Sequence, residues 1–116
     1  MSRSEPPNAA RLVLSTAPDL EVARRLARRL VEARLVACVN LLPGTTSVYR
    51  WQGAVQEDTE VLLVFKTTVE RLAELEERLL AEHPYDTPEF VVIEPDSVSP
   101  AYLAWLRSSV ALPDEA

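Results

Sequence analysis

The sequence is poor in the residue types on which most enzymes and metal sites depend. Its 116 residues include one histidine (His83), one cysteine (Cys38), one lysine (Lys66) and two glycines. A single cysteine forms no disulfide within the chain, and zinc or copper sites usually take three or four nitrogen or sulfur ligands. Two glycines are too few for a GxGxxG or Walker A loop, and HExxH and GxSxG are also absent. We therefore do not expect an enzyme.

Positive charge and long apolar runs are scarce as well. Lysine and arginine number 12 against 18 acidic residues, which gives a net charge of −6 and a pI of about 4.8. Nucleic acids and anionic membranes recruit basic surfaces, so neither is an expected partner. Apolar runs such as residues 61–65 are far shorter than the roughly 20 residues of a membrane span, and the first ten residues lack the apolar core of a secretory signal. These absences predict a cytoplasmic protein.

The length suits one domain. Residues 1–9 contain two prolines and show no apolar periodicity, so we expect a disordered N-terminal tail, a single domain over 10–112 and a short tail at 113–116.

Apolar periodicity predicts the elements of this domain. Short apolar runs predict strands at 12–15, 37–42, 46–52, 61–65 and 90–93. A first helix is predicted to begin after Thr16, with Thr16 as its N-terminal capping residue. Two further helices are predicted at 70–82 and 99–107. In the second helix the inward residues should be Leu72, Leu75, Leu79 and Leu80.

The element order indicates an α+β fold of the ferredoxin-like type. Residues 37–67 would form a long hairpin that is interrupted at Pro43 and turns at Gln52 and Gly53. The resulting βαββαβ order, with an extra C-terminal helix, predicts an antiparallel sheet with two helices on one face. Residues 61–65 are apolar on both faces of their strand. Because one helix layer covers only one face, a second subunit is expected to cover the other.

Five segments carry a resemblance to a known family. In chain order they are TAPD (16–19), ACVNLLPGTTSVYRWQG (37–53), ExxLxxKT (60–67), HPYDTPE (83–89) and PAYLAWL (100–106). Together, over about residues 11–110, they resemble the CutA family of divalent-cation tolerance proteins. The resemblance implies a ferredoxin-like homotrimer whose long hairpins pair across subunits, as in the P-II signalling proteins. It also implies a binding protein linked to tolerance of copper and other divalent cations, without catalytic activity.

His83 is the metal-ligand candidate, because neutral imidazole suits Cu(II) and other divalent cations. The resemblance adds Ser15 and Glu82, which stand where some family members carry a cysteine and a second histidine assigned to copper. The hydroxyl of Ser15 and the carboxylate of Glu82 are harder, weaker copper ligands than a cysteine thiolate and a histidine imidazole. The alternative interpretation makes His83 a helix-end residue that packs beside Pro84 and Tyr85.

Several residues are candidates for a cleft or an interface between subunits. Tyr49 and Trp51 lie on the same face of their strand, because side chains along a strand alternate between its two faces. Interfaces between proteins are enriched in tyrosine and tryptophan. Lys66 is expected to pair with Glu60 or Glu89, or else to bind an anion. The full candidate set is Tyr49, Trp51, Lys66, Tyr85 and Glu89.

Three functions stay open at this point. The first is a divalent-cation binding protein. The second is a P-II-like regulatory module that binds a small anionic metabolite in the clefts between subunits. The third is a structural or partner-docking trimer without a small ligand.

Overall fold

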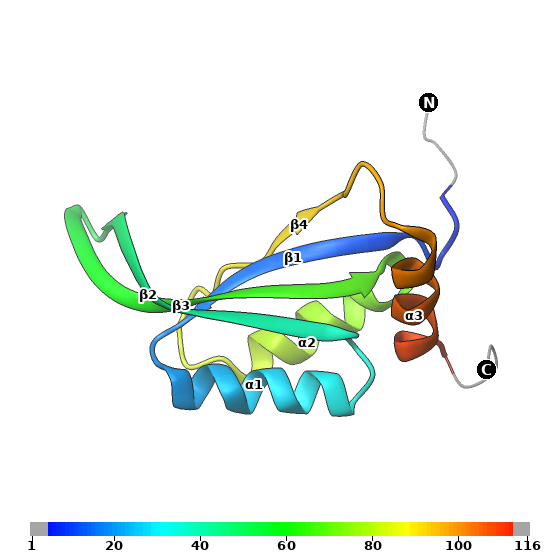
Figure 1. The fold of residues 1–116 in the computed structure, drawn as a ribbon. Coiled ribbons are helices and arrows are strands. Elements are labelled where there is room, and N and C mark those ends of the chain that lie inside the picture. The colour runs from blue at the N-terminus through cyan, green and yellow to red at the C-terminus, as the bar shows by residue number, and fades with distance from the viewer. Residues whose placement is uncertain (1–4, 113–116) are drawn as a thin grey trace.

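A four-stranded antiparallel sheet organises residues 5–112, the part of the chain that the computed structural model describes (Figure 1). Its strands lie in the order β2-β3-β1-β4. Their bounds are β1 Ala10–Ala17, β2 Cys38–Trp51, β3 Ala54–Thr68 and β4 Val91–Ile93. The helices are α1 Leu20–Glu32, α2 Leu72–Glu82, which follows the 3-10 turn η1 Val69–Arg71, and α3 Pro100–Val110. The expected βαββαβ order with an extra C-terminal helix is confirmed.

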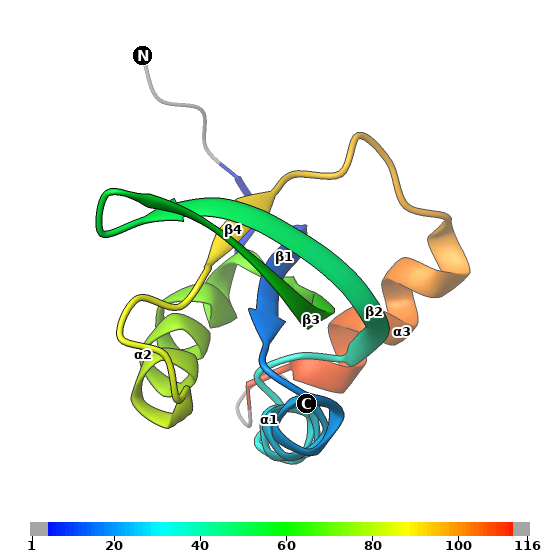
Figure 2. The same cartoon turned by 90° about the vertical axis from the view of Figure 1, so that its left-hand side faces the viewer.

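One face of the sheet forms the core with α1 and α2, which lie together on that side (Figures 1 and 2). Alternate residues of β1 and β3 point toward these helices, because side chains along a strand alternate between faces. The fully buried side chains include Val13, Leu26, Leu30, Leu63, Phe65, Leu75 and Leu79. Leu80 was expected to be inward but is 41% exposed. Leu75 and Leu79 hold the inward stripe of α2, and the residue after Leu79 is turned away by about 100°.

The start of α1 differs from the prediction. Thr16 still pairs with Leu62 in the ladder between β1 and β3, so it cannot cap the helix. Asp19 is the N-cap instead, and its carboxylate accepts a hydrogen bond of 2.9 Å from the backbone N–H of Val22. Asp is a favoured capping residue because it satisfies one of the free N–H groups of the first turn.

Strands β2 and β3 form one long hairpin that projects beyond the rest of the sheet (Figure 1). Gln52 and Gly53 both have positive φ, 50° and 80°, as the predicted two-residue turn requires. The interruption expected at Pro43 is a register shift between Leu42 and Thr45, after which pairing resumes. The hairpin tip is held by this backbone pairing and by a hydrogen bond from Tyr49 to Asp58 across the hairpin, and its apolar residues Val48 and Val55 are 63% and 66% exposed.

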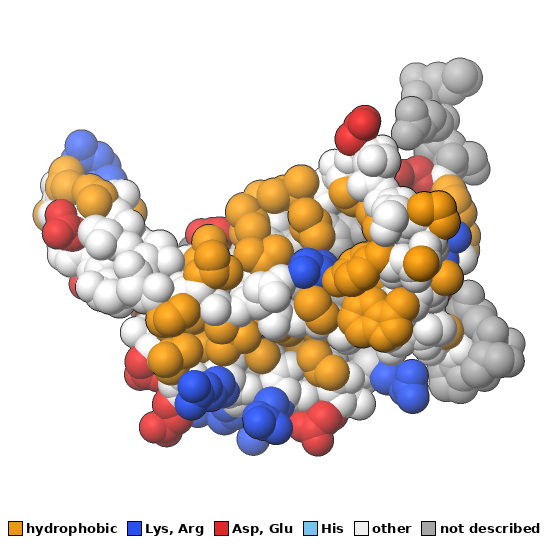
Figure 3. Space-filling model, in the orientation of Figure 1, with side chains coloured by type: hydrophobic (Ala, Val, Ile, Leu, Met, Phe, Trp, Pro, Cys, Tyr) orange, Lys and Arg blue, Asp and Glu red, His pale blue; other side chains and the backbone are white. Residues whose placement is uncertain are grey.

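The second face of the sheet has little cover within the chain. We call it the open face, and its apolar residues are Leu12, Leu14, Leu42, Leu62, Val64, Val91 and Ile93, which the strand register places on one side. They range from half-buried to 47% exposed. Helix α3 covers one end, where Leu106 and Val110 pack with Ala37. Figure 3 shows hydrophobic side chains gathered over the sheet and α3.

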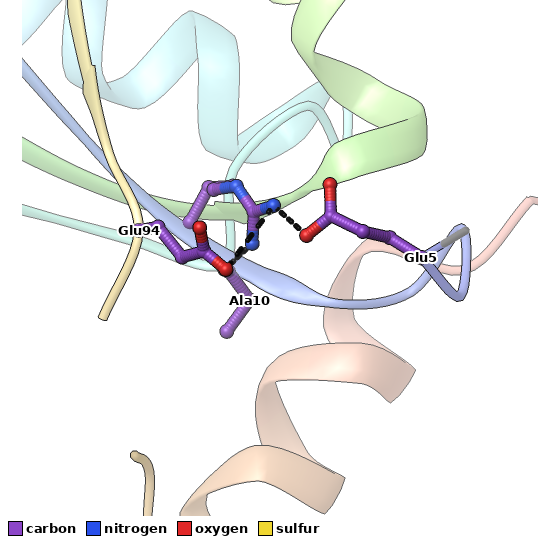
Figure 4. Close-up of polar contacts among 4 residues, drawn as sticks. Glu5, Ala10 and Glu94 are labelled. Atoms are coloured by element: carbon purple, nitrogen blue, oxygen red, sulfur yellow. Dashed lines mark hydrogen bonds and ion pairs between the residues drawn. The ribbon is translucent and has the colours of Figure 1, made fainter. Parts of the chain in front are cut away.

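The segment before β1 is joined to the domain by several bonds. Backbone N–H groups of Val69 and Glu70 donate to the carbonyls of Ala9 and Pro7, both at 2.9 Å. The buried guanidinium of Arg11 pairs with Glu5 and lies 3.9 Å from Glu94 (Figure 4). Residues 1–4 and 113–116 of the expected tails lie outside the described residues, and the domain boundaries stay a prediction. No helix within residues 5–112 has the length and hydropathy to cross a bilayer.

Candidate functional site

A cavity of about 780 Å³ lies between the β2–β3 hairpin and the loop that follows α2, at the opposite end of the sheet from α3 (Figure 1). We call it the hairpin cavity. Its lining residues are Thr16, Ser47, Val48, Tyr49, Trp51, Glu60, Pro84, Tyr85, Asp86, Thr87, Pro88 and Glu89. Four of the five cleft candidates are thus brought together, Tyr49 and Trp51 from β2 and Tyr85 and Glu89 from the loop after α2. Lys66 is not among them.

His83 fixes the loop that forms one wall of this cavity. It follows the last residue of α2, and only 7% of it is exposed. The backbone N–H of Tyr85 donates to Nδ1 at 3.1 Å, so Nδ1 must carry the lone pair. The other nitrogen, Nε2, then carries the proton and donates to the carbonyl of Thr16 at 2.7 Å. One imidazole therefore joins the loop to β1, across 67 positions of sequence.

A buried carboxylate and two tyrosines form the polar part of the cavity. The hydroxyl of Tyr85 donates to Oε2 of Glu60 at 2.6 Å, and Glu60 is only 8% exposed. Burial and this hydrogen bond raise the pKa of Tyr85 well above its ordinary value. The hydroxyl of Tyr49 donates to Asp58, and that bond is the main reason why the pKa of Tyr49 is raised. Both phenols are therefore protonated donors at neutral pH, and both donate to carboxylates.

The charge of the cavity has one sign. Glu60, Asp86 and Glu89 contribute carboxylates, and no lysine, arginine or histidine is among the lining residues. Among the residues that the structure describes, Glu60 has no ion-pair partner. Within one chain, the cavity therefore offers negative potential beside aromatic rings. The P-II-like alternative concerns clefts between subunits and stays a prediction.

The donor set at the predicted metal position does not fit a copper ion. Both ring nitrogens of His83 are already in hydrogen bonds. The carboxylate of Glu82 lies 3.1 Å from Arg29 and 3.9 Å from Arg78. Ser15 is fully buried. Over residues 5–112, no three or more His, Cys, Asp or Glu side chains gather in a group that could hold a metal ion. Metal ligation by Ser15, Glu82 and His83 stays a prediction.

Lys66 lies elsewhere and has different partners from those expected. Its ammonium donates to Oδ1 of Asn40 at 2.5 Å and lies 6.0 Å from the ring centroid of Tyr102 on α3. The expected ion pair with Glu60 or Glu89 is wrong. Glu60 is six positions away along β3, and at about 3.3 Å per residue the two side chains stand at opposite ends of the sheet.

Sequence reasoning missed the cavity role of Glu60, Asp58 and Asp86. Part of this could have been found from the predicted turn at Gln52 and Gly53. That turn sets a register in which Ser47 faces Asp58, so Tyr49 and Asp58 become diagonal neighbours across the hairpin. The contact between Glu60 and Tyr85 left no such signal, because it depends on the path of the loop after α2.

Comparison with known proteins is consistent with this fold. The family model described as CutA1 divalent ion tolerance protein matches residues 11–109. The divalent-cation tolerance protein CutA of Thermus thermophilus is 52% identical over 98 residues, which span 84% of this chain and 95% of that protein. The chloroplastic protein CutA of Arabidopsis thaliana is 43% identical over 84% of this chain and 54% of its own length.

A solved structure gives the same result. The divalent cation tolerance protein of Thermus thermophilus superposes with a TM-score of 0.85 at 50% identity, over 88% of this chain and 99% of that one. The family model covers far more than half of the chain, and both sequence and fold agree with it. The chain therefore belongs to the CutA1 divalent ion tolerance family.

Proposed function

We propose that this protein is a homotrimeric, cytoplasmic binding protein that acts in divalent-cation tolerance, with a ferredoxin-like subunit and a P-II-like assembly. The observation that carries the proposal is the open face. Its apolar side chains cover most of one side of the sheet, and Val91, Leu42 and Ile93 are 47%, 44% and 38% exposed. Contiguous apolar surface of this kind marks association sites in soluble proteins.

The shape of the hairpin supports association into a closed ring. Its tip projects beyond the subunit and bears exposed Val48, Tyr49, Trp51 and Val55. A tip that lies on a neighbouring subunit would bury these side chains, and the release of water from apolar surface would favour the contact. The lone Cys38 is a free thiol, which suits the reducing environment of the cytoplasm.

Light scattering after gel filtration should give about three times the chain mass of 12.9 kDa. The physical reason is that the apolar side chains of the open face and of the hairpin tip are both buried only when neighbouring subunits cover them. The measurement should be repeated at several protein concentrations, so that a weak association is distinguished from a stable one. A mass near that of one chain at micromolar concentration would contradict the proposal.

A divalent cation held directly by His83 is a second candidate. One observation favours it: the hydroxyl of Ser15 is buried and has no hydrogen-bond partner among the described residues. The engaged nitrogens of His83 and the ion pairs of Glu82 weigh against it.

Calorimetric titration with Cu(II) should accordingly show only weak, non-saturating heat. The matched variant is His83→Gln, whose amide can still donate toward the carbonyl of Thr16 but offers no imidazole. Wild type and variant should give the same trace, with Zn(II) as a competing ion. Saturable binding at a whole-number ratio per trimer, lost in His83→Gln, would instead place the metal at His83.

A further inference from the structure

Helix α1 concentrates positive charge in an acidic chain. It contains four arginines and two glutamates, a net charge of +2, whereas the rest of the chain carries −8. Figure 3 shows Lys and Arg side chains gathered over this helix. The alanine and leucine side of α1 packs in the core, and the arginines are exposed on the other side. We call these four residues the arginine face: Arg24, Arg25, Arg28 and Arg29.

Most of the arginine face has no partner within the described part of the chain. Arg29 alone is in an ion pair there, 3.1 Å from Glu82. The two glutamates of α1 stand four positions from Arg25 and Arg28, yet no ion pair joins them across residues 5–112. Arginines four positions apart also repel each other, which slightly destabilises a helix. The face therefore carries positive charge that the subunit itself does not use.

The spacing of these arginines suits an extended acidic segment. Arg24 and Arg28 form one row along the helix, and Arg25 and Arg29 form a second. Residues four apart are separated by about 6 Å along a helix axis, and side chains two apart on an extended chain by about 6.6 Å. Carboxylates at every second position of an extended segment can therefore meet one row. Each guanidinium can bind a carboxylate through two parallel hydrogen bonds.

An apolar cavity of about 250 Å³ lies beside the second half of α1. Its lining residues are Ala27, Arg28, Val31, Glu32 and Val39. Val31 is 41% exposed. Val39 pairs in register with Phe65, whose side chain is buried under the helices, so the cavity opens on the helix side of the sheet and not on the open face. An apolar side chain beside an acidic run can enter this cavity.

The position of α1 is compatible with the proposed assembly. Helices α1 and α2 lie on the side of the sheet opposite the open face (Figure 2). Subunits that meet through their open faces leave α1 on the outside, so each trimer presents three arginine faces.

The small size of the arginine face favours a short peptide over an extended polyanion. The four arginines span about 8 Å of helix, and Glu21 and Glu32 stand at the two ends. Nucleic acid or an anionic membrane reaches beyond this length and would meet the negative remainder of the surface. A peptide segment of a few residues covers the positive area alone.

We propose that the arginine face docks a partner protein through a short, extended run of aspartate and glutamate with an apolar residue beside it. Arg24, Arg25 and Arg28 bind the carboxylates, and the cavity at Val31 takes the apolar side chain. This inference goes beyond the proposed function, because it adds a partner surface to a binding protein. It rests on the proposed assembly only in that the trimer leaves α1 uncovered.

Fluorescence anisotropy with a dye-labelled peptide tests the proposal on the full chain. The probe is Leu-Glu-Glu-Glu-Glu-Leu with blocked ends, titrated at low ionic strength, where exposed charges are only weakly screened. It should bind saturably, and added NaCl should weaken the binding. The same peptide with glutamine in place of every glutamate should not bind.

Two variants that each lower the net charge by one form a matched pair. Arg28→Gln should weaken peptide binding by about threefold, and the double variant Arg24→Gln/Arg28→Gln by about tenfold. Glutamine forms helices about as well as arginine, so α1 should stay intact. Ser97→Glu should bind like wild type, because Ser97 is exposed on the loop between β4 and α3, on the far side of the sheet from α1 (Figure 1).

A third variant tests the apolar cavity. Val31→Ser should weaken binding of the leucine-flanked peptide but not of a peptide of four glutamates alone. Equal affinity of wild type and Val31→Ser for the leucine-flanked peptide would overturn the contact with the cavity.

Three outcomes would overturn the docking of an acidic peptide. They are an anisotropy that rises without saturation, equal weakening in Arg28→Gln and Ser97→Glu, and tighter saturable binding of single-stranded DNA or of phosphatidylserine vesicles than of the peptide. The mass measurement is read separately. A trimer that does not bind the peptide overturns this inference alone, and a single chain that binds it overturns the assembly alone.

Discussion

Replacement of Val64 by glutamate should convert the proposed trimer into a single chain of 12.9 kDa. Val64 lies in the middle of the open face, where it faces Leu14 on β1 and Asn40 on β2. Association would bury one new carboxylate per subunit among apolar side chains, and each unpaired buried charge costs several kcal/mol. Val64 is only half-buried within the chain, so the separated subunit should keep its fold.

The matched control is Leu80→Glu. Leu80 is a large apolar residue of α2 that is 41% exposed, and α2 lies on the opposite side of the sheet (Figure 2). This variant gains the same charge and should remain trimeric. Light scattering reports the mass of both proteins, and circular dichroism shows whether each is folded. A Val64→Glu protein that keeps the trimer mass would mean that the open face is covered in some other way.

The contrast between the two faces of β3 was readable from the sequence. Residues 61–65 carry apolar side chains at every position, and this pattern predicts that both faces of the strand are covered. In the structure Val61, Leu63 and Phe65 are buried, whereas Leu62 and Val64 lie on the open face. The turn at Gln52 and Gly53 was equally readable, because few residue pairs allow positive φ at both positions.

Other features depend on contacts that no local pattern records. The local sequence predicts Thr16 as the cap of α1, but the ladder with β3 extends past Thr16, and Asp19 caps the helix. Strand length was decided by pairing with a distant segment rather than by the residues near Thr16. Lys66 was expected to find a carboxylate because the chain is acidic, yet the register of β2 places Asn40 within its reach.

The candidate site was predictable in its members but not in its organisation. The strand pattern and the family resemblance predict Tyr49, Trp51, Tyr85 and Glu89 as cleft or interface residues, and all four line one cavity. For Glu60 the sequence suggests only an ion pair with Lys66. The contact between Glu60 and Tyr85 depends on the path of residues 83–89. A single long-range hydrogen bond from His83 to the carbonyl of Thr16 holds this loop in place.

That bond leads to the second large effect. His83→Ala should lower the free energy of unfolding by roughly 1–3 kcal/mol, because it removes the two hydrogen bonds of a buried imidazole and leaves the partly buried carbonyl of Thr16 without its donor. His83→Gln should lose less, since its amide can still donate to that carbonyl. Urea unfolding at one fixed protein concentration measures both variants, because the stability of an oligomer depends on concentration.

Addition of EDTA to the same unfolding experiment separates the two roles proposed for His83. If the imidazole acts as a link between the loop and β1, chelation should leave the stability of wild type and of His83→Ala unchanged. If a bound cation makes the link, EDTA should lower wild type to the level of the alanine variant. The link should also matter for the hairpin cavity, because His83 positions the loop that carries Tyr85.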